Sequence, residues 1–340
     1  MTSASSREFT RTPSHFADRI TANGEGGWPV AAGRYRLVIS RACPWASRAA
    51  ITRRLMGLDS VISQAVTDPI QERIDGINQW VFTAASGSPD GIDPVLGIHA
   101  IQQIYQARER DYPGGESVPI IVDIPSRTLV TNDYSKMTLD LATQWTALQR
   151  PGAPDLYPRH LRDEIDELNQ SIYTDVNNGV YRAGFAQTQD RYEEAVKALF
   201  VRLDVLEERL AGRRFLVGET ITECDIRLFV TLVRFDAVYH GHFKCNIAKL
   251  IEYPALWAYA RDLYQTPGFG DTVDLDHIRR HYYSVHDKIN PTRVVAVGPN
   301  PIQWLTAHHR EQLGGRPFGT GTPPPPPLAE DRVAHPVPSG

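Results

Sequence analysis

Cysteine is scarce in this sequence, which has three among its 340 residues, at positions 43, 224 and 245. An odd number of cysteines, far apart along the chain, does not form the disulfide framework of a small secreted domain. The sequence also shows no secretory signal and no apolar run long enough to span a bilayer. We therefore expect a protein of the reducing cytoplasm that does not associate with membranes.

The sequence also lacks a strong charge of one sign. Its 36 lysines and arginines stand against 40 aspartates and glutamates, which gives a formal net charge of −4. The basic residues are interspersed with acids, as in the Arg-Glu-Arg run at 108–110. Such a surface has no general field that would attract nucleic acid or anionic lipid, so we expect neither as a partner.

Metal-binding residue types occur at short spacing at His240, His242 and Cys245. A zinc site needs four protein ligands, or three and a water molecule. No Cys-x-x-Cys pair accompanies these residues. We therefore expect no metal site.

The most informative feature that is present is the pair Cys43-Pro44, which lies between a short apolar run at 35–40 and a helical pattern that ends at Gly57. The run predicts a buried strand, and Pro44 fits the first turn of a helix. Cys43 then falls at the helix N-cap, where free N–H groups and the helix dipole favour a negative charge. This position predicts a lowered thiol pKa and a nucleophilic or redox cysteine.

The first half of the chain has the element order of a thioredoxin-like α/β domain, which we place at 34–149 after an extended N-terminal arm at 1–33. A loop at 68–94 is longer than usual and is expected to be functional. The elements that follow the first strand and helix are a strand at 61–67, a helix at 98–107, strands at 118–123 and 128–131, and a helix from Asn132 or Asp133 to Trp145.

The second half has the character of an all-helical domain, placed at 155–300 after a Pro- and Gly-rich linker. Residues 222–225 (Thr-Glu-Cys-Asp) have the spacing of a helix capping box, which makes Cys224 a packing residue. A C-terminal extension at 301–340 follows, with five consecutive prolines at 323–327. We expect residues 316–340 to be disordered or polyproline-like.

Several local sequences spread over residues 28–300 resemble one family. They are 43–46 (Cys-Pro-Trp-Ala), 155–158 (Asp-Leu-Tyr-Pro), 176–186 (Val-Asn-Asn-Gly-Val-Tyr-Arg-Ala-Gly-Phe-Ala), 232–236 (Leu-Val-Arg-Phe-Asp), 242–245 (His-Phe-Lys-Cys), 276–279 (Asp-His-Ile-Arg), 281–282 (His-Tyr) and 289–292 (Ile-Asn-Pro-Thr). Together they resemble the glutathionyl-hydroquinone reductases, or Xi-class glutathione transferases, which are related to the omega class. The resemblance implies a thioredoxin-like domain followed by an all-helical glutathione-transferase domain.

The resemblance also implies a chemistry for three residues. The Cys43 thiolate would attack the sulfur of a thiol–hydroquinone conjugate and form a mixed disulfide, which a second thiol would resolve. Tyr181 and Tyr282 match the two tyrosines that serve the hydroquinone ring in the family. The family needs no bound organic cofactor, so the expected partners are a low-molecular-weight thiol and a quinol conjugate.

The thiol site is implied by further matches. Val118 and Pro119 match the cis-proline position of thioredoxin-like proteins, where the backbone pairs with the bound thiol like a strand. Trp80 matches a tryptophan that lies over the thiol. Trp45 either caps the thiolate or packs in the core.

Two departures from the family concern the identity of the thiol. Asp133 and Tyr134 stand where the family typically has a Glu-Ser pair that holds the γ-glutamyl group of glutathione. Ser47 stands where many members have histidine. Glutathione is therefore one candidate cosubstrate, and another is a thiol without a γ-glutamyl group, such as mycothiol.

Two other functions fit parts of the same pattern. An omega-like thiol transferase, reducing dehydroascorbate or mixed disulfides, would share Cys43. A non-catalytic protein that binds an aromatic or thiol ligand would not need a reactive cysteine. By analogy with folds of this type, we expect a symmetric homodimer.

Overall fold

The computed structural model describes residue 11 and residues 13–334. Its first half contains a four-stranded sheet in which β1 pairs with β2 in parallel and with β5 antiparallel, and β5 pairs antiparallel with β6. The element order expected from the sequence is confirmed. Across the sheet, the strands are β2 (Ser63–Val66), β1 (Tyr35–Ile39), β5 (Ile120–Asp123) and β6 (Thr128–Thr131).

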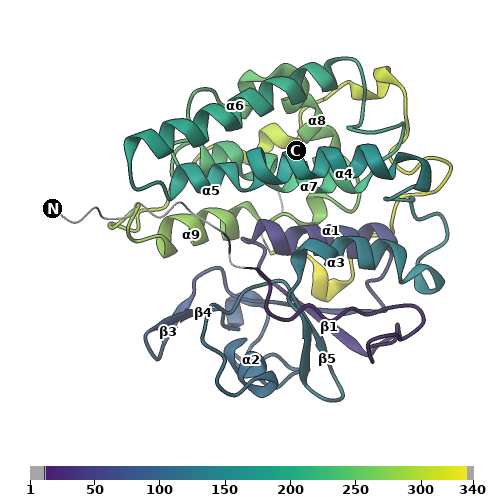
Figure 1. Cartoon of the computed structure of the whole chain (residues 1–340), viewed down its shortest axis with the longest axis vertical. Helices are drawn as coiled ribbons and strands as arrows, with labels where there is room; N and C mark the ends of the chain where they lie inside the picture. The colour runs from purple at the N-terminus through teal and green to yellow at the C-terminus, as the bar shows by residue number, and fades with distance from the viewer. Residues whose placement is uncertain (1–10, 12, 335–340) are drawn as a thin grey trace.

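Helices cover both faces of this sheet (Figure 1). Helices α1 and α3 lie between the sheet and the helical half, whereas α2 lies on the opposite face. Every residue of β1 is buried, because this central strand is covered from both sides. The three helices are α1 (Pro44–Met56), α2 (Gln102–Arg108) and α3 (Tyr134–Thr143).

The ends of these elements follow from their residues. Helix α1 has Pro44 in its first turn and ends at Gly57, whose φ of 69° suits glycine. The strand expected to start at Val118 begins at Ile120 instead, since the Val118–Pro119 peptide bond is cis and Pro119 has no N–H to donate. The side chain of Asp133 caps α3 by accepting from the N–H of Ser135, as expected.

The long loop at 68–94 contains a two-stranded hairpin of β3 (Glu72–Ile74) and β4 (Ile77–Gln79). The hairpin delivers Trp80, which follows β4 directly, to the inside of the protein with 7% of its surface exposed. The loop therefore has structure of its own. Whether it also has a separate function stays a prediction.

The second half is a helical layer with α7 at its centre. All residues of α7 are buried, and α7 packs against α1, so it forms the junction between the halves. No helix in the part of the chain described is both long and apolar enough to cross a membrane. The helices are α4 (Arg162–Ser171), α5 (Gly179–Gly184), α6 (Gln189–Ala211), α7 (Glu223–Arg234), α8 (Pro254–Gln265) and α9 (Leu275–Val285).

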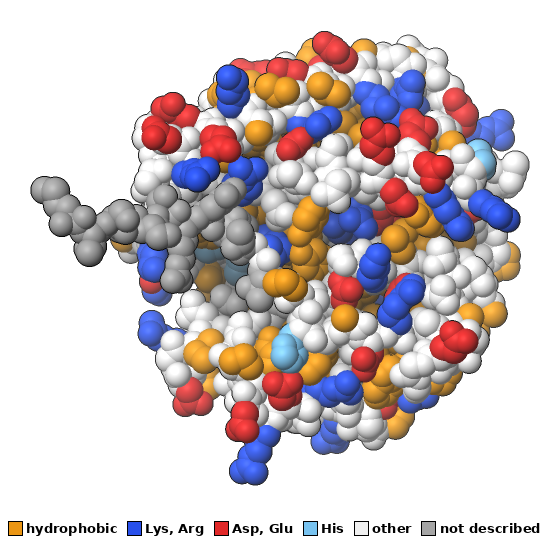
Figure 2. Space-filling view, viewed as in Figure 1, with side chains coloured by type: hydrophobic (Ala, Val, Ile, Leu, Met, Phe, Trp, Pro, Cys, Tyr) orange, Lys and Arg blue, Asp and Glu red, His pale blue; other side chains and the backbone are white. Residues whose placement is uncertain are grey.

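The capping box predicted at Thr222–Asp225 starts α7. The Asp225 carboxylate accepts from the Thr222 N–H at 2.7 Å, and it also accepts from the Tyr259 hydroxyl at 2.7 Å. Cys224, within the box, is fully buried, as a packing residue should be. The surface in Figure 2 carries acidic and basic side chains side by side, in keeping with the mixed charge pattern of the sequence.

Of the two states expected for the C-terminal tail, disorder is wrong for residues 316–334, and the polyproline-like state stays a prediction. The start of this segment packs on the helical half, where the N–H of Arg316 donates to the carbonyl of Glu219 at 2.9 Å. Further along, buried arginines of α1 use the tail as their partner. Arg54 donates to the carbonyl of Pro325 at 2.7 Å, and Arg53 pairs with Asp331 at 2.9 Å. Proline has no N–H but keeps its carbonyl acceptor, so a proline-rich segment can still satisfy guanidinium groups. Residues 335–340 lie outside the described part.

The N-terminal arm also packs on the first half. Phe16 and Ile20 are buried, and Ala17 forms an isolated bridge beside Thr131 of β6. The carbonyl of Phe16 accepts from the N–H of Asn132 at 2.9 Å. Residues 16–20 therefore lie along the edge of the sheet, and the chain then turns at 21–27. Residues 1–10 and 12 lie outside the described part, and the extended arm at 1–33 stays a prediction.

We predict that Asp331→Ala lowers the free energy of unfolding by about 2 kcal/mol, because the buried Arg53 guanidinium loses its tail carboxylate and keeps only Asp59 as an acidic partner. Glu330→Ala, at the exposed neighbouring position, is the matched control and should change it by less than about 0.5 kcal/mol. Urea denaturation of both variants measures the difference. Equal stability of the two would show that the tail contact contributes nothing.

Candidate active site

Cys43 lies where the sequence places it, at the N-cap of α1 directly after the strand–loop that follows β1. Its backbone is extended, with φ −78° and ψ 119°, as an N-cap residue requires. The thiol is partly buried and lies 3.3 Å from the carbonyl oxygen of Val118, to which it can donate. Cys43 and the cis-proline loop, far apart in sequence, therefore meet.

The pKa of the Cys43 thiol is raised above its ordinary value, which corrects the expectation of a lowered pKa. Burial is the largest cause, since it disfavours the charged thiolate. The N–H groups of Ala46 and Trp45 and the charges of Arg234 and Arg11 act in the opposite direction. The helix N-terminus thus favours the thiolate as expected, but the burial imposed by the whole fold outweighs it.

The two tyrosines matched by resemblance come together in the helical half. The hydroxyls of Tyr181 on α5 and Tyr282 on α9 lie 2.5 Å apart, and the hydroxyl of Tyr239 lies 2.9 Å from that of Tyr282. Burial raises the pKa of all three phenols, so they keep their protons at neutral pH. Tyr239 was missed from the sequence, although it lies only three residues after the matched segment 232–236.

Tyr181 also faces the cysteine. A negative charge on Cys43 raises the pKa of Tyr181, whereas the nearby guanidinium of Arg11 lowers it. The ring of Tyr181 lies 6.4 Å from that of Trp45, the second residue after Cys43. The helical half thus presents a phenol to Cys43 of the first half.

A pocket of about 400 Å³ is lined by Trp45, Val118 and Tyr134 from the thiol site expected by resemblance. Cys43 does not line it, but its thiol lies 3.3 Å from the carbonyl of the lining residue Val118. Its other wall includes Arg11 and His15 of the N-terminal arm. Trp45 is 6% exposed, and its ring is covered by guanidinium groups of Arg11 at 4.3 Å and of Arg48. This pocket is large enough for part of a small thiol molecule.

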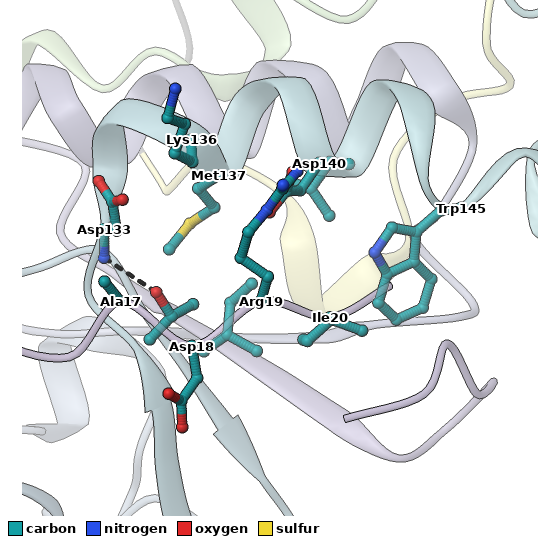
Figure 3. A pocket seen from close by; sticks show the side chains of 12 residues that line it. Ala17, Asp18, Arg19, Ile20, Asp133, Lys136, Met137, Asp140 and Trp145 are labelled. Atoms are coloured by element: carbon teal, nitrogen blue, oxygen red, sulfur yellow. Dashed lines mark hydrogen bonds and ion pairs between the residues drawn. The ribbon is translucent and has the colours of Figure 1, made fainter. Parts of the chain in front are cut away.

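Three other residues of the expected thiol site, Trp80, Pro119 and Asp133, do not line this pocket. Asp133 faces a separate crevice of about 10 Å³ beside Lys136, shown in Figure 3, which is too small for a thiol cosubstrate. Trp80 stacks on His281 with ring centroids 4.8 Å apart. Pro119 follows the pocket residue Val118 through the cis bond.

Arg234 is a second residue that sequence reasoning missed, although the matched segment 232–236 contains it. Its buried guanidinium donates to the carbonyls of Arg41 at 2.9 Å and Ala42 at 3.1 Å, just before Cys43. It also donates to the hydroxyl of Ser47 at 2.7 Å. These hydrogen bonds depend on the packing of α7 against α1, which the sequence pattern does not show.

The histidines near the tyrosines are buried and neutral. His242 and His286 lie 3.1 Å apart, and burial lowers their pKa values to about 4 and about 3. Burial also raises the pKa of Cys245. Within residue 11 and residues 13–334, no three His, Cys, Asp or Glu side chains are grouped so that they could hold a metal ion.

Comparison with known proteins agrees with this geometry. The family model for the glutathione S-transferase C-terminal domain matches residues 189–262. The chain is 40% identical to the glutathionyl-hydroquinone reductase YqjG of Escherichia coli over 304 residues, which cover 88% of this chain and 91% of YqjG. The chain belongs to the glutathionyl-hydroquinone reductase family, the Xi-class glutathione transferases.

Solved structures extend this likeness to the fold. A glutathione transferase from Gordonia bronchialis is 55% identical, has a TM-score of 0.91, and covers 95% of this chain and 99% of its own. The glutathione-bound structure of YqjG is 39% identical, has a TM-score of 0.81, and covers 87% of this chain and 96% of its own. The chain therefore has the fold of a glutathione transferase, with its thioredoxin-like and helical parts, and is an enzyme of this superfamily.

We predict that iodoacetamide alkylates Cys43 slowly at pH 7 and that the rate rises as the pH passes 9. The raised pKa keeps the thiol protonated at neutral pH, and only the thiolate reacts. Mass spectrometry of the peptide that contains Cys43 measures the rate, with Cys43→Ser as the unlabelled control. A rate that already reaches its plateau at pH 7 would contradict the raised pKa.

Proposed function

We propose that this enzyme reduces thiol conjugates of hydroquinones to free hydroquinones, with Cys43 as the nucleophile. The observation that carries the proposal is the buried hydroxyl pair of Tyr181 and Tyr282 presented beside Cys43. Exchange between thiols and disulfides does not require two neutral phenols next to the cysteine. A hydroquinone carries two hydroxyl groups, and neutral phenols can form hydrogen bonds with them.

In the first step, the Cys43 sulfur attacks the sulfur of the conjugate. A sulfur–sulfur bond forms and the bond from sulfur to the aromatic carbon breaks, with its electron pair going to that carbon. The Cys43 thiol loses its proton and the carbon takes one up, which yields the free hydroquinone and a mixed disulfide on Cys43. Tyr181 and Tyr282 support this step, because their raised pKa values keep both phenols protonated and able to donate.

In the second step, a free thiol attacks the mixed disulfide. The Cys43 thiolate leaves and the thiol molecules depart as their own disulfide, so two molecules of thiol supply the two electrons that the aromatic carbon received. Val118 supports this assignment: its carbonyl lies next to Cys43, where a bound thiol's backbone could pair with it. Trp45 and Tyr134 complete the wall against which the thiol would lie.

The thiol is glutathione or a related molecule without the γ-glutamyl group, such as mycothiol. Two contacts support the second choice. The Asp133 carboxylate already accepts from the N–H and the hydroxyl of Ser135, at 3.0 and 2.5 Å. The Tyr134 hydroxyl is turned toward that of Tyr173, 3.1 Å away. The Asp133 carboxylate and the Tyr134 hydroxyl are therefore both engaged within the protein. The start of α3 has no residue in the place of the family's serine, whose hydroxyl would hold a γ-glutamyl carboxylate.

We predict that Cys43→Ser abolishes turnover of a thiol–hydroquinone conjugate, because the oxygen cannot form the mixed disulfide. Tyr181→Phe and Tyr282→Phe should each lower kcat by about tenfold to a thousandfold without unfolding the protein, since each removes one proton donor. Product formation followed by liquid chromatography measures this, with circular dichroism as the control for folding.

The activity of Cys43→Ser, together with the substrates that the wild-type protein accepts, decides between the functions. Full activity of this variant would overturn the mechanism. Wild-type activity on mixed disulfides or dehydroascorbate, with none on quinone conjugates, would indicate an omega-like thiol transferase instead. Inactivity on all of these substrates would favour a ligand-binding protein.

We predict that mycothiol conjugates leave a mycothiol adduct on Cys43 and turn over at least tenfold faster than glutathione conjugates, because the pocket offers no dedicated partner for the γ-glutamyl group. Mass spectrometry of Cys43 after one turnover without free thiol identifies the adduct. Wild-type and Tyr134→Ser proteins are compared, and the variant should gain activity with glutathione. Faster turnover of glutathione conjugates by the wild-type protein would identify glutathione as the cosubstrate.

The homodimer and the cytoplasmic location stay predictions. A single chain tests neither of them.

A further inference from the structure

The carbonyl groups that precede α1 converge on one side chain from the other half of the protein. Arg234, at the end of α7, is 1% exposed. Its Nε donates to the carbonyl of Ala42 at 3.1 Å, and one terminal nitrogen donates to the carbonyl of Arg41 at 2.9 Å. The planar fork of a guanidinium can hold two neighbouring carbonyls in this way, which a lysine ammonium cannot do with the same geometry.

Ser47 links Arg234 to a third carbonyl group. The same terminal nitrogen of Arg234 donates to the Ser47 hydroxyl at 2.7 Å, and that hydroxyl donates to the carbonyl of Cys43 at 3.1 Å. Arg234 therefore reaches the carbonyls of Arg41, Ala42 and, through Ser47, Cys43. These are three consecutive peptide units immediately before the first turn of α1.

The remaining nitrogen of Arg234 fixes the side chain to its own helix. It donates to the carbonyl of Val230 at 2.7 Å. The guanidinium is thus held at both ends, by α7 on one side and by the cysteine loop on the other. Because α7 is wholly buried, this anchor cannot move without disturbing the core.

We propose that Arg234 is the positioning residue of the active site, which holds the loop of Cys43 at the distance and angle that the sulfur needs to attack the conjugate. The inference rests on the proposed role of Cys43 as nucleophile. Ser47, which departs from the family's frequent histidine, acts here as the link between the guanidinium and the cysteine carbonyl.

The charge of Arg234 adds a second effect on the same sulfur. The charged and titratable groups that face Cys43 are Arg234 from α7, Arg11 from the N-terminal arm and Tyr181 from α5. Tyr181 stays neutral at moderate pH, because burial raises its pKa. Arg234 and Arg11 lower the pKa of Cys43 against the effect of its burial. Removing Arg234 therefore leaves less thiolate at any given pH.

The test separates charge from position with two variants. Arg234→Met should slow the alkylation of Cys43 by iodoacetamide at pH 8 about tenfold, which corresponds to a rise of one unit in the thiol pKa. Arg234→Lys keeps the charge, so its alkylation rate should stay within about threefold of wild type, while kcat with a thiol–hydroquinone conjugate falls by about tenfold to a hundredfold because the fork is lost.

Arg310→Met is the matched control. Arg310 is 3% exposed and donates to backbone carbonyls of Leu210 and Arg214, so its loss is a similar structural lesion in the helical half. This variant should lower thermal stability but leave the alkylation rate and kcat within about twofold of wild type. If Arg310→Met and Arg234→Met lowered the alkylation rate and kcat to the same extent, the effect would be a general one of removing a buried arginine. That result would overturn the proposal.

Ser47→Ala keeps the proposal testable if Arg234→Met does not fold. It breaks the link to the Cys43 carbonyl and leaves Arg234 charged. We expect an unchanged alkylation rate, an unchanged KM and a kcat about tenfold lower. A wild-type kcat in folded Ser47→Ala and Arg234→Lys would overturn the positioning role. If the wild-type protein had no activity on any conjugate, the proposed function would be rejected. The alkylation rates of the variants would still measure the effect of Arg234 on the Cys43 thiol.

Discussion

Buried arginines that donate to backbone carbonyls hold the two halves of this protein together. Arg234 and Arg41, at most 5% exposed, both donate to carbonyls outside their own half of the chain. A guanidinium stays charged when it is buried, so it must find acceptors, and the segments that supply them are fixed in place. The position of the cysteine loop relative to the tyrosines of the helical half depends on this junction.

Features that depend on neighbouring residues were predictable from the sequence. The N-cap position of Cys43, the cap at Asp133 and the capping box at Thr222 each follow from a few consecutive residues, and all three occur in the structure. The cis bond before Pro119 and the proximity of Tyr181 and Tyr282 followed from family resemblance. Local pattern and family motif thus predicted the fold and these local features, whereas the catalytic roles of the residues stay predictions.

Features that depend on distant contacts were not predictable in this way. Arg234 belongs to a matched motif, but only the packing of α7 against α1 shows that its side chain reaches Ala42. The lowered pKa expected for Cys43 took account of the helix terminus, which acts as predicted, and omitted the burial of the sulfur in the folded protein. That burial disfavours the thiolate.

The ordered tail has a consequence for how the chain is made. Arg53 of α1 pairs with Asp331, 278 positions later, and Arg41 donates to the carbonyl of that same residue. A chain that emerges from the ribosome N-terminus first exposes these arginines long before their partner has been synthesised. The cysteine-bearing half therefore reaches its final structure only after residue 331 has been synthesised, although it comes earlier in the sequence.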